Sequence, residues 1–185
     1  MLIPDHDPRV PGRTILHEAF LAFVFGTLAI SIMGLIAHFA SAPFIFPSLG
    51  PTAFLIFHRP TASAASPRNT ITGHAIGAAC GLGALALCGL LDAGSVLTQG
   101  EVTVPRALAA GLSLGATSGL MVLFKRGHPP AGATTLIISL GLMSRPDEVA
   151  VLLLAVVLLV GEGLLIHRIA GTPYPLWRPG HAPVG

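Results

Sequence analysis

The stretch that decides the fold is GHPPAGATT, residues 127–135, which lies between two apolar segments. Pro129 and Pro130 both fix φ near the helical value and lack an N–H donor, so a helix can begin at Pro130 or just after it but cannot run through this point. The free N–H groups and positive dipole end of a helix that begins there can hold an anion or another polar ligand. At membrane depth such irregular backbone must face protein or a water-lined cavity. We therefore interpret residues 127–135 as the start of a membrane-embedded half-helix; a surface turn between two helices is the alternative.

The composition favours a membrane protein. Of the 185 residues, 52% are hydrophobic and only 10% are charged, whereas about 25% of the residues of a soluble domain are charged. Cys80 and Cys88 lie about 12 Å apart along one predicted helix, too far to bridge each other, and the histidines lack metal-ligand spacing. We therefore expect no disulfide, metal site or cofactor. The formal net charge of +2 says little by itself, and no nucleic-acid partner is expected.

Long and short apolar segments alternate along the chain. Each long segment has about the 20 residues that cross a bilayer, whereas each short segment has fewer and is next to helix breakers. The long segments are 16–40, 71–91, 104–124 and a helix that starts at 144–147 and ends near 167, and the short ones are 43–57 and 136–143. We predict one all-helical transmembrane domain at residues 16–169, between a cytoplasmic tail at 1–15 and a Pro-rich cytoplasmic tail at 170–185.

Local signals refine the long segments. Asn69 is a candidate N-cap for the second long helix, and Ser144 is one for the last. Glycines recur every four residues at 73–81 and at 111–119. Because such spacing lets membrane helices approach closely, we expect the second and third long helices to cross along their glycine faces.

The order of these parts occurs twice. Residues 16–91 and residues 104–169 each contain a long run, a short run broken by Pro and Gly, an Arg-Pro pair and a second long run. Three crossings per repeat would invert the second repeat relative to the first, which is the plan of many transporters. Because few residues are identical, chance similarity of apolar sequence is the alternative. The aligned residues are Pro47 with Pro129, Gly50 with Gly132, and Thr52 with Thr134.

Charge placement distinguishes two topologies. If all six segments cross, eight of the ten Lys and Arg residues lie on one side and only Arg106 and Arg145 on the other. If the two short segments re-enter and return, five fall on each side. The positive-inside rule therefore favours six crossings with both termini in the cytoplasm. The eight are Arg9, Arg13, Arg59, Arg68, Lys125, Arg126, Arg168 and Arg178.

Polar residues around the broken segments form the candidate site. A small anion needs positive potential and hydrogen-bond donors that do not hold it too tightly. Helix starts after Pro51 and after Pro130 offer N–H donors, and Arg68 offers a positive approach from the cytoplasm. His74 and His128 can bind an anion when protonated or carry a proton with it, because the unperturbed pKa of histidine is near 6.5. The candidate substrate-binding residues are Ser48, Gly50, Thr52, Arg68, Asn69, His74, His128, Pro129, Pro130, Gly132, Thr134 and Thr135.

Each of these side chains also has a structural explanation. Either histidine can be neutral and hydrogen-bonded to nearby backbone, and Arg68 can be an ordinary membrane-surface anchor. Glu162 is the one carboxylate well inside an apolar run and is therefore a further functional candidate. A pair between Glu162 and Arg168 or His167 near the membrane surface is the alternative.

Three ordered motifs resemble those of the HPP family of integral membrane proteins. They are FPSLGPTA at 46–53, SPRNTITGH at 66–74 and GHPPAGAT at 127–134, and the resemblance covers about residues 16–169. It implies a transporter of four helices, with nitrite as the substrate associated with plastid and cyanobacterial members. We predict six apolar segments, whereas the family is described as having four helices. The counts differ because the two short broken segments escape methods based on hydropathy. No Ser- and Arg-rich transit leader is present, so a bacterial inner membrane is expected.

The sequence therefore predicts a transporter of a small anion, embedded in the lipid bilayer and assembled as a homo-oligomer because six helices enclose little volume. A passive channel for a small polar solute and a structural or regulatory membrane subunit are the alternatives. An enzyme is not expected, because no aspartate falls within an apolar run and no Gly-x-Ser-x-Gly motif occurs.

Overall fold

A computed structural model describes residues 15–42 and 44–179, which form helices and connecting loops without any strand. Four of the helices are long and apolar enough to cross a membrane, namely α1 (Ile15–Ala40), α3 (Pro67–Leu87), α5 (Val104–Leu123) and α7 (Pro146–Ile169). The shorter elements are α2 (Leu49–His58), the 3-10 turn η1 (Ser63–Ala65), α4 (Val96–Gln99) and α6 (Ala131–Ser139). The all-helical fold with four long and two broken segments is confirmed. Most of the predicted N-terminal tail and the end of the C-terminal tail lie outside the described residues.

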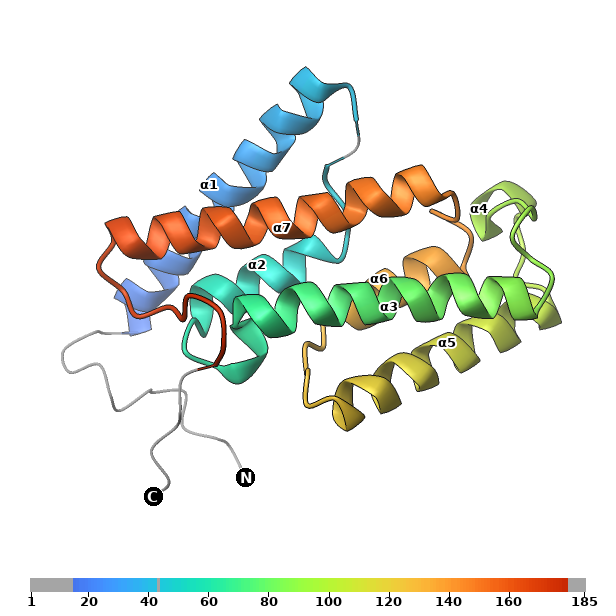
Figure 1. The fold of residues 1–185 in the computed structure, drawn as a ribbon. Coiled ribbons are helices and arrows are strands. Elements are labelled where there is room, and N and C mark those ends of the chain that lie inside the picture. Colours follow the sequence, from blue (N-terminus) through green and yellow to red (C-terminus); the bar gives the residue numbers. More distant parts are fainter. Residues whose placement is uncertain (1–14, 43, 180–185) are drawn as a thin grey trace.

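The six principal helices alternate in direction. Figure 1 shows that α1, α3 and α6 run one way along the molecule and that α2, α5 and α7 run the other way. Each helix of the triplet α5–α7 therefore runs opposite to its counterpart in the triplet α1–α3. In addition, α3 packs against α5 and α6, whereas α7 packs against α1 and α2. In an inverted repeat, the last helix of each triplet would pack against the first two helices of the other triplet, as α3 and α7 do here. The repeat itself stays a prediction.

The two short helices reach only part of the way across a bilayer. At 1.5 Å per residue, the 10 residues of α2 and the 9 residues of α6 extend about 15 and 14 Å, half of a hydrocarbon core of about 30 Å. Helix α6 begins directly after Pro130, as predicted. Helix α2 begins at Leu49 rather than after Pro51. Pro51 is tolerated there because the first four N–H groups of a helix have no partner within it.

Both predicted N-caps lie at other positions. Helix α3 begins at Pro67, and the side chain of Ser66 accepts a hydrogen bond from the backbone N–H of Asn69 at 3.4 Å. Asn69, predicted as the cap, instead donates from its Nδ2 to the Ser63 carbonyl at 2.9 Å. The cap falls earlier because proline is favoured in the first helical turn.

At the start of α7 the N-cap is Arg145, not Ser144. Here too a proline, Pro146, occupies the first helical position, which sets the cap one residue before it. The Glu148 carboxylate accepts from the backbone N–H groups of Ser144 and Arg145 at 3.2 and 3.1 Å. Glu148 thus satisfies donors at this helix end that lack an intrahelical partner.

The glycine faces of α3 and α5 do not meet, so that expectation is wrong. The α3 glycines face α6: a Cβ on Gly77 would lie 2.8 Å from the Ala131 carbonyl oxygen and from Thr135 Oγ1. In contrast, Gly111, Gly115 and Gly119 of α5 are exposed and have no heavy atom within 4 Å of an added Cβ. Helix α5 turns its polar stripe inward because polar groups are costlier than glycine to expose to lipid. The buried residues of α5 are Arg106, Ala109, Ser113, Thr117 and Met121.

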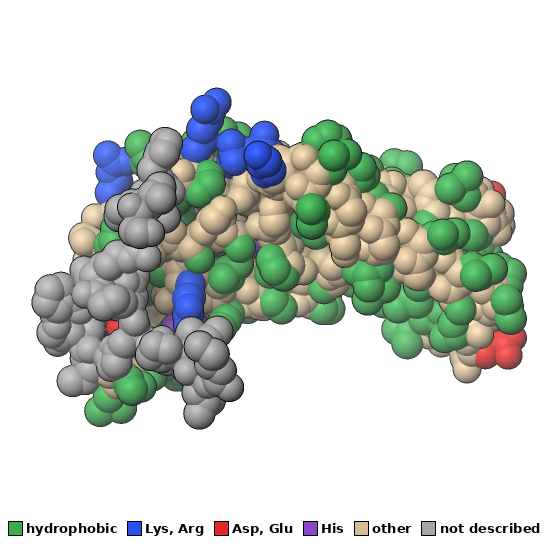
Figure 2. Space-filling model, turned by 90° about the horizontal axis from the view of Figure 1, so that it is seen from below, with side chains coloured by type: hydrophobic (Ala, Val, Ile, Leu, Met, Phe, Trp, Pro, Cys, Tyr) green, Lys and Arg blue, Asp and Glu red, His purple; other side chains and the backbone are tan. Residues whose placement is uncertain are grey.

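Charges separate along the molecule. On the face in Figure 2, Lys and Arg side chains gather over one half, and exposed carboxylates stand at the opposite tip. Arg68 at the start of α3 lies near Arg126, which follows α5, whereas Asp92 and Glu101 lie in the connections around α4 at the other end. The six-crossing topology itself stays a prediction from the positive-inside rule.

The contact between α3 and α6 gives a direct test. Gly77→Ala should lower the free energy of unfolding by about 1 to 3 kcal/mol, because the methyl group meets backbone and must push α6 away. Gly115→Ala is the matched control and should leave stability nearly unchanged, because its Cβ meets open space. Thermal unfolding of the purified variants in detergent measures both effects. Equal stability of the two variants would contradict the packing.

Candidate functional site

Two histidines and two threonines form a buried polar cluster at the break. His74 of α3 and His128, just before α6, are both 0% exposed, and their Nε2 atoms lie 3.2 Å apart. Thr52 Oγ1 of α2 lies 3.0 Å from His74 Nε2 and 3.3 Å from His128 Nε2. Thr134 Oγ1 of α6 lies 2.7 Å from His74 Nδ1. The cluster therefore joins both short helices through one histidine of α3.

Local structure explains why these side chains meet. A Cβ on Gly73 would lie 2.8 Å from His128 Cβ, so only glycine lets the loop at His128 approach α3 this closely. His74 follows Gly73 directly and points into the same contact. Thr52 and Thr134, which align with each other in the predicted repeat, are each the fourth residue of their short helix. The two threonines reach opposite ring nitrogens of His74.

One backbone carbonyl assigns the protons of the whole cluster. His128 Nδ1 lies 2.7 Å from the Ala64 carbonyl oxygen, which can only accept, so Nδ1 carries the hydrogen and donates it. The Nε2 atom of the neutral His128 is then an acceptor, and it receives the Nε2–H of His74, which Thr52 shares. His74 Nδ1 is consequently an acceptor for the hydroxyl of Thr134. Thr52 donates its own hydrogen to the Ser48 carbonyl at 2.8 Å.

The closed cluster does not favour a charged His128. His128 is fully buried, and none of its hydrogen-bond partners among the described residues is a carboxylate, so a charge on its ring would have no counter-ion there. The neutral ring is therefore the form that this arrangement stabilises. The pair can bind an anion as a cation only after a proton enters or the surroundings open.

The N–H groups at the start of α6 are not free, contrary to expectation. Ala131, Gly132 and Ala133 donate to the carbonyls of His128, Pro129 and Pro130 at 3.0, 3.0 and 3.1 Å. The loop closes into successive turns because buried backbone donors otherwise remain unsatisfied. The imidazoles and threonine hydroxyls, rather than backbone donors, are the groups in the cluster that can meet a ligand.

Three of the remaining predicted residues adjoin the cluster. Ser48 is buried, and its own Oγ has no partner in the described part of the chain. Thr135 is buried and lies 2.9 Å from Thr117 Oγ1 of α5. Pro130 is buried at the α6 start.

The other predicted residues lie apart from the histidine pair. Gly50 and Pro129 are exposed, and Gly132 packs against Leu114. Arg68 and Asn69 lie at the start of α3, where the Arg68 N–H donates to the Trp177 carbonyl at 3.0 Å. The structure therefore assigns these five residues to the surroundings of the cluster and not to its contacts.

Sequence reasoning missed three contributors. Thr70 Oγ1 lies 3.4 Å from His128 Nδ1, Ala64 supplies the carbonyl that fixes the tautomer, and Thr117 extends the polar contacts to α5. Thr70 was detectable, because it lies one helical turn before His74 on the same face. Ala64 contributes only backbone, which no residue pattern reveals.

Glu162 does not form the pair with Arg168 or His167 that was the alternative to a functional role. Both carboxylate oxygens are buried and have no hydrogen-bond partner among the described residues. His167 instead contacts the Ile56 carbonyl at 3.1 Å through Nε2. Nearby, burial raises the pKa of the Tyr174 phenol, whose hydroxyl donates to the Ala65 carbonyl at 2.9 Å.

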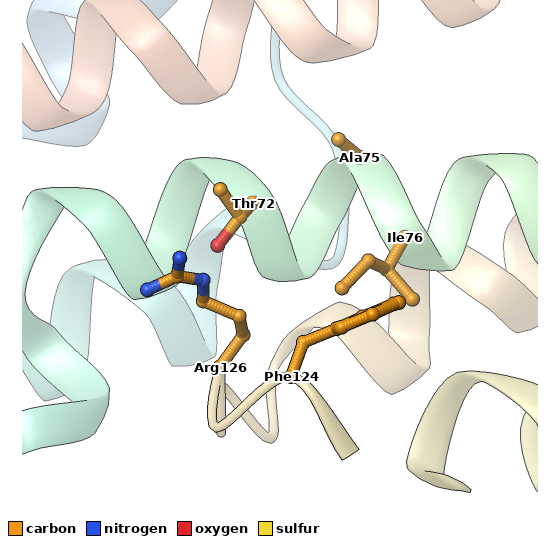
Figure 3. Close-up of a pocket in the computed structure, with 5 residues that line it drawn as sticks. All are labelled: Thr72, Ala75, Ile76, Phe124 and Arg126. Carbon is orange, nitrogen blue, oxygen red and sulfur yellow. The ribbon is translucent and has the colours of Figure 1, made fainter. Parts of the chain in front are cut away.

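A cavity of about 360 Å³ lies on another face of α3. Thr72, Ala75 and Ile76 of α3 line it together with Phe124 and Arg126, which follow α5 (Figure 3). None of these residues belongs to the histidine cluster. The cluster is closed to solvent, whereas the cavity is open beside the basic end of the molecule.

The bond between Thr134 and His74 predicts a stability difference. Thr134→Val should destabilise the protein by about 1 to 3 kcal/mol, because His74 Nδ1 loses its donor in a buried site. Thr134→Ser keeps the hydroxyl and should lose less. Thermal unfolding in detergent compares the two variants. A valine variant as stable as the serine variant would show that the hydroxyl does not satisfy the imidazole.

The chain is similar to known transmembrane proteins. Residues 11–175 match the HPP transmembrane region. One transmembrane protein of Dictyostelium discoideum is 30% identical over 146 residues, covering 76% of this chain and 46% of that protein. A second from the same organism is 29% identical over 131 residues, covering 69% of this chain and 39% of its own length, so the chain spans less than half of either relative. No solved structure matches the chain. Together with the four spanning helices, the match over residues 11–175 shows that the chain is a multi-pass membrane protein of the HPP family.

Proposed function

We propose that the protein moves a small inorganic anion across the membrane and that the His74–His128 pair is the central binding site. One observation carries the proposal: two fully buried imidazoles face each other where the short helices α2 and α6 come together. Broken helices at corresponding positions mark the binding site in transporters built from inverted repeats. Nitrite is the substrate that the family resemblance suggests.

The geometry supports proton coupling. A proton added to His128 Nε2 would point at His74 Nε2, which must then accept a hydrogen bond. The single ring N–H of His74 must therefore move from Nε2 to Nδ1. His74 Nδ1–H would donate to Thr134, whose hydroxyl donates in the neutral cluster. One added proton thus reverses the bonds from Thr134 to His128 and gives the pair the single positive charge that a monovalent anion needs.

Closure of the pair favours a transporter over an open channel. Both histidines are 0% exposed, so an anion can reach them only after neighbouring segments move. A passive pore would need a continuous opening. Catalysis is not part of the proposal, because no carboxylate bonds to either histidine in the described residues and general-base catalysis by histidine commonly uses such a group.

The proposed orientation places the basic end in the cytoplasm of a bacterial cell, with the inner membrane as the location. Arg68 and Arg126 lie together at that end and would attract anions toward the α3 start. A homo-oligomer in the lipid bilayer remains part of the proposal, since the exposed glycine face of α5 is free to approach another helix.

Uptake into proteoliposomes tests the function. Nitrite, nitrate, formate and chloride should be compared with and without a pH gradient. We expect protein-dependent nitrite uptake that an inward proton gradient accelerates, and a loss of about tenfold or more in His128→Ala, because about 1.4 kcal/mol of lost stabilisation corresponds to that factor. Arg68→Ala should reduce the rate less and in a salt-dependent manner, because it acts on approach.

Matched controls use residues outside the site. His38→Ala removes an exposed histidine of α1, and Arg145→Ala removes an arginine whose side chain is 72% exposed at the opposite end. Both should transport like the unaltered protein. Absence of flux for all four anions from folded protein would refute anion transport. Flux that ignores the proton gradient would refute coupling, and failure to concentrate substrate against a gradient would favour a channel.

A further inference from the structure

Arg106 is a buried cation at the opposite end of α6 from His128. It lies in the first turn of α5 and is 1% exposed. Its Nη1 donates to the Ser139 carbonyl at 3.3 Å, at the α6 end, and its Nη2 donates to the Gly94 carbonyl at 2.7 Å, before α4. The guanidinium also lies against Gly141, where a Cβ would come within 3.0 Å of Nη1. Three separate segments therefore enclose one positive charge.

This charge lacks a counter-ion in the described residues, where its hydrogen-bond partners are backbone carbonyls. An arginine near a membrane surface normally extends toward water or lipid headgroups, and burial of 99% of Arg106 excludes both as its partner. Its Nε and the hydroxyl of Ser139 are both buried without a hydrogen-bond partner. Burying a charge with unsatisfied donors is costly unless something pairs with it.

We propose that Arg106 and Ser139 form a second anion-binding site, on the far side of the membrane from the basic end. The ligand class is a small oxyanion with two oxygens in one plane, such as nitrite, nitrate or formate. The Nε–H lies beside an Nη–H on one edge of a guanidinium, and that edge binds two oxygens at once. Ser139 Oγ supplies a third donor. The inference rests on the proposed function for its role but not for the binding itself.

Two polar side chains lie between the two sites. Thr117 of α5 and Thr135 of α6 lie 2.9 Å apart, both fully buried, between the histidine pair and Arg106 along α6. The connection before α4 closes the second site, because Gly94 bonds Arg106 and Val96 N–H donates to the Leu140 carbonyl at 3.1 Å. An anion that enters from the far side takes the place of the Gly94 carbonyl on the guanidinium.

A purely structural Arg106 would bind the two carbonyls and nothing else, so the decisive variant must spare both bonds. Ser139→Ala does so, because it removes only the unpartnered hydroxyl and keeps the Ser139 carbonyl. Arg106→Lys keeps the charge but loses the planar edge. Ser118→Ala, which removes an exposed hydroxyl of α5, is the control.

The experiment measures nitrite-dependent thermal stabilisation of purified protein in a His128→Ala background, in which the central site is removed. We expect nitrite to raise the melting temperature of His128→Ala, and Ser139→Ala or Arg106→Lys to weaken that effect about tenfold or more in apparent affinity. Ser118→Ala should leave it unchanged. Sodium chloride at equal ionic strength separates specific binding from general salt effects.

Two results would overturn the second site. One is a His128→Ala protein that nitrite does not stabilise, and the other is stabilisation that neither Ser139→Ala nor Arg106→Lys weakens. Because the readout is binding in detergent, it stands apart from flux: loss of transport with retained, Ser139-dependent binding would refute the proposed function and keep this site.

Discussion

The hydrogen bond from His128 Nδ1 to the Ala64 carbonyl, 2.7 Å long, is the interaction on which the site depends. It ties the loop before α6 to the turn before α3, which are 64 residues apart. Because a carbonyl only accepts, the bond assigns the tautomer of His128 and, through it, the donors and acceptors of His74, Thr52 and Thr134. A structural contact thus sets the chemistry of four side chains.

That bond requires a close approach of backbones, which the glycines of α3 allow. Gly73, Gly77 and Gly81 each leave space that His128, Ala131 or Ile138 occupies. The polar stripe of α5 closes the other side of α6. In consequence the short helix lies between the glycine stripe of α3 and a surface of α5 that carries hydroxyls and one arginine, and its two ends differ in the charge they meet.

Much of this arrangement follows from the sequence, and the failures have physical causes. Two adjacent prolines stop a helix from running through this point, so the sequence placed the start of α6 at Pro130 or just after it, and α6 begins at Ala131. The glycine spacing predicted close packing but not the partner, because a periodic stripe says nothing about which helix lies against it. Thr52 and Thr134 emerged from the alignment of breakers, whereas Ala64 could not, since any residue can present a carbonyl. The donors at the α6 start were misjudged because turns in the preceding loop satisfy them.

The dipole of α6 gives a reason for a cation at its C-terminal end. A helix carries about half a positive charge at its N-terminus and half a negative charge at its C-terminus. An anion on the proposed path would therefore be held beside His128 and repelled near Ser139. The guanidinium of Arg106, bonded to the Ser139 carbonyl, offsets the negative end. Conduction needs binding that is strong enough for the anion to enter and weak enough for it to leave. The guanidinium at the far end lowers the difference in the anion's free energy between the position beside His128 and the position near Ser139, and this lets the anion depart.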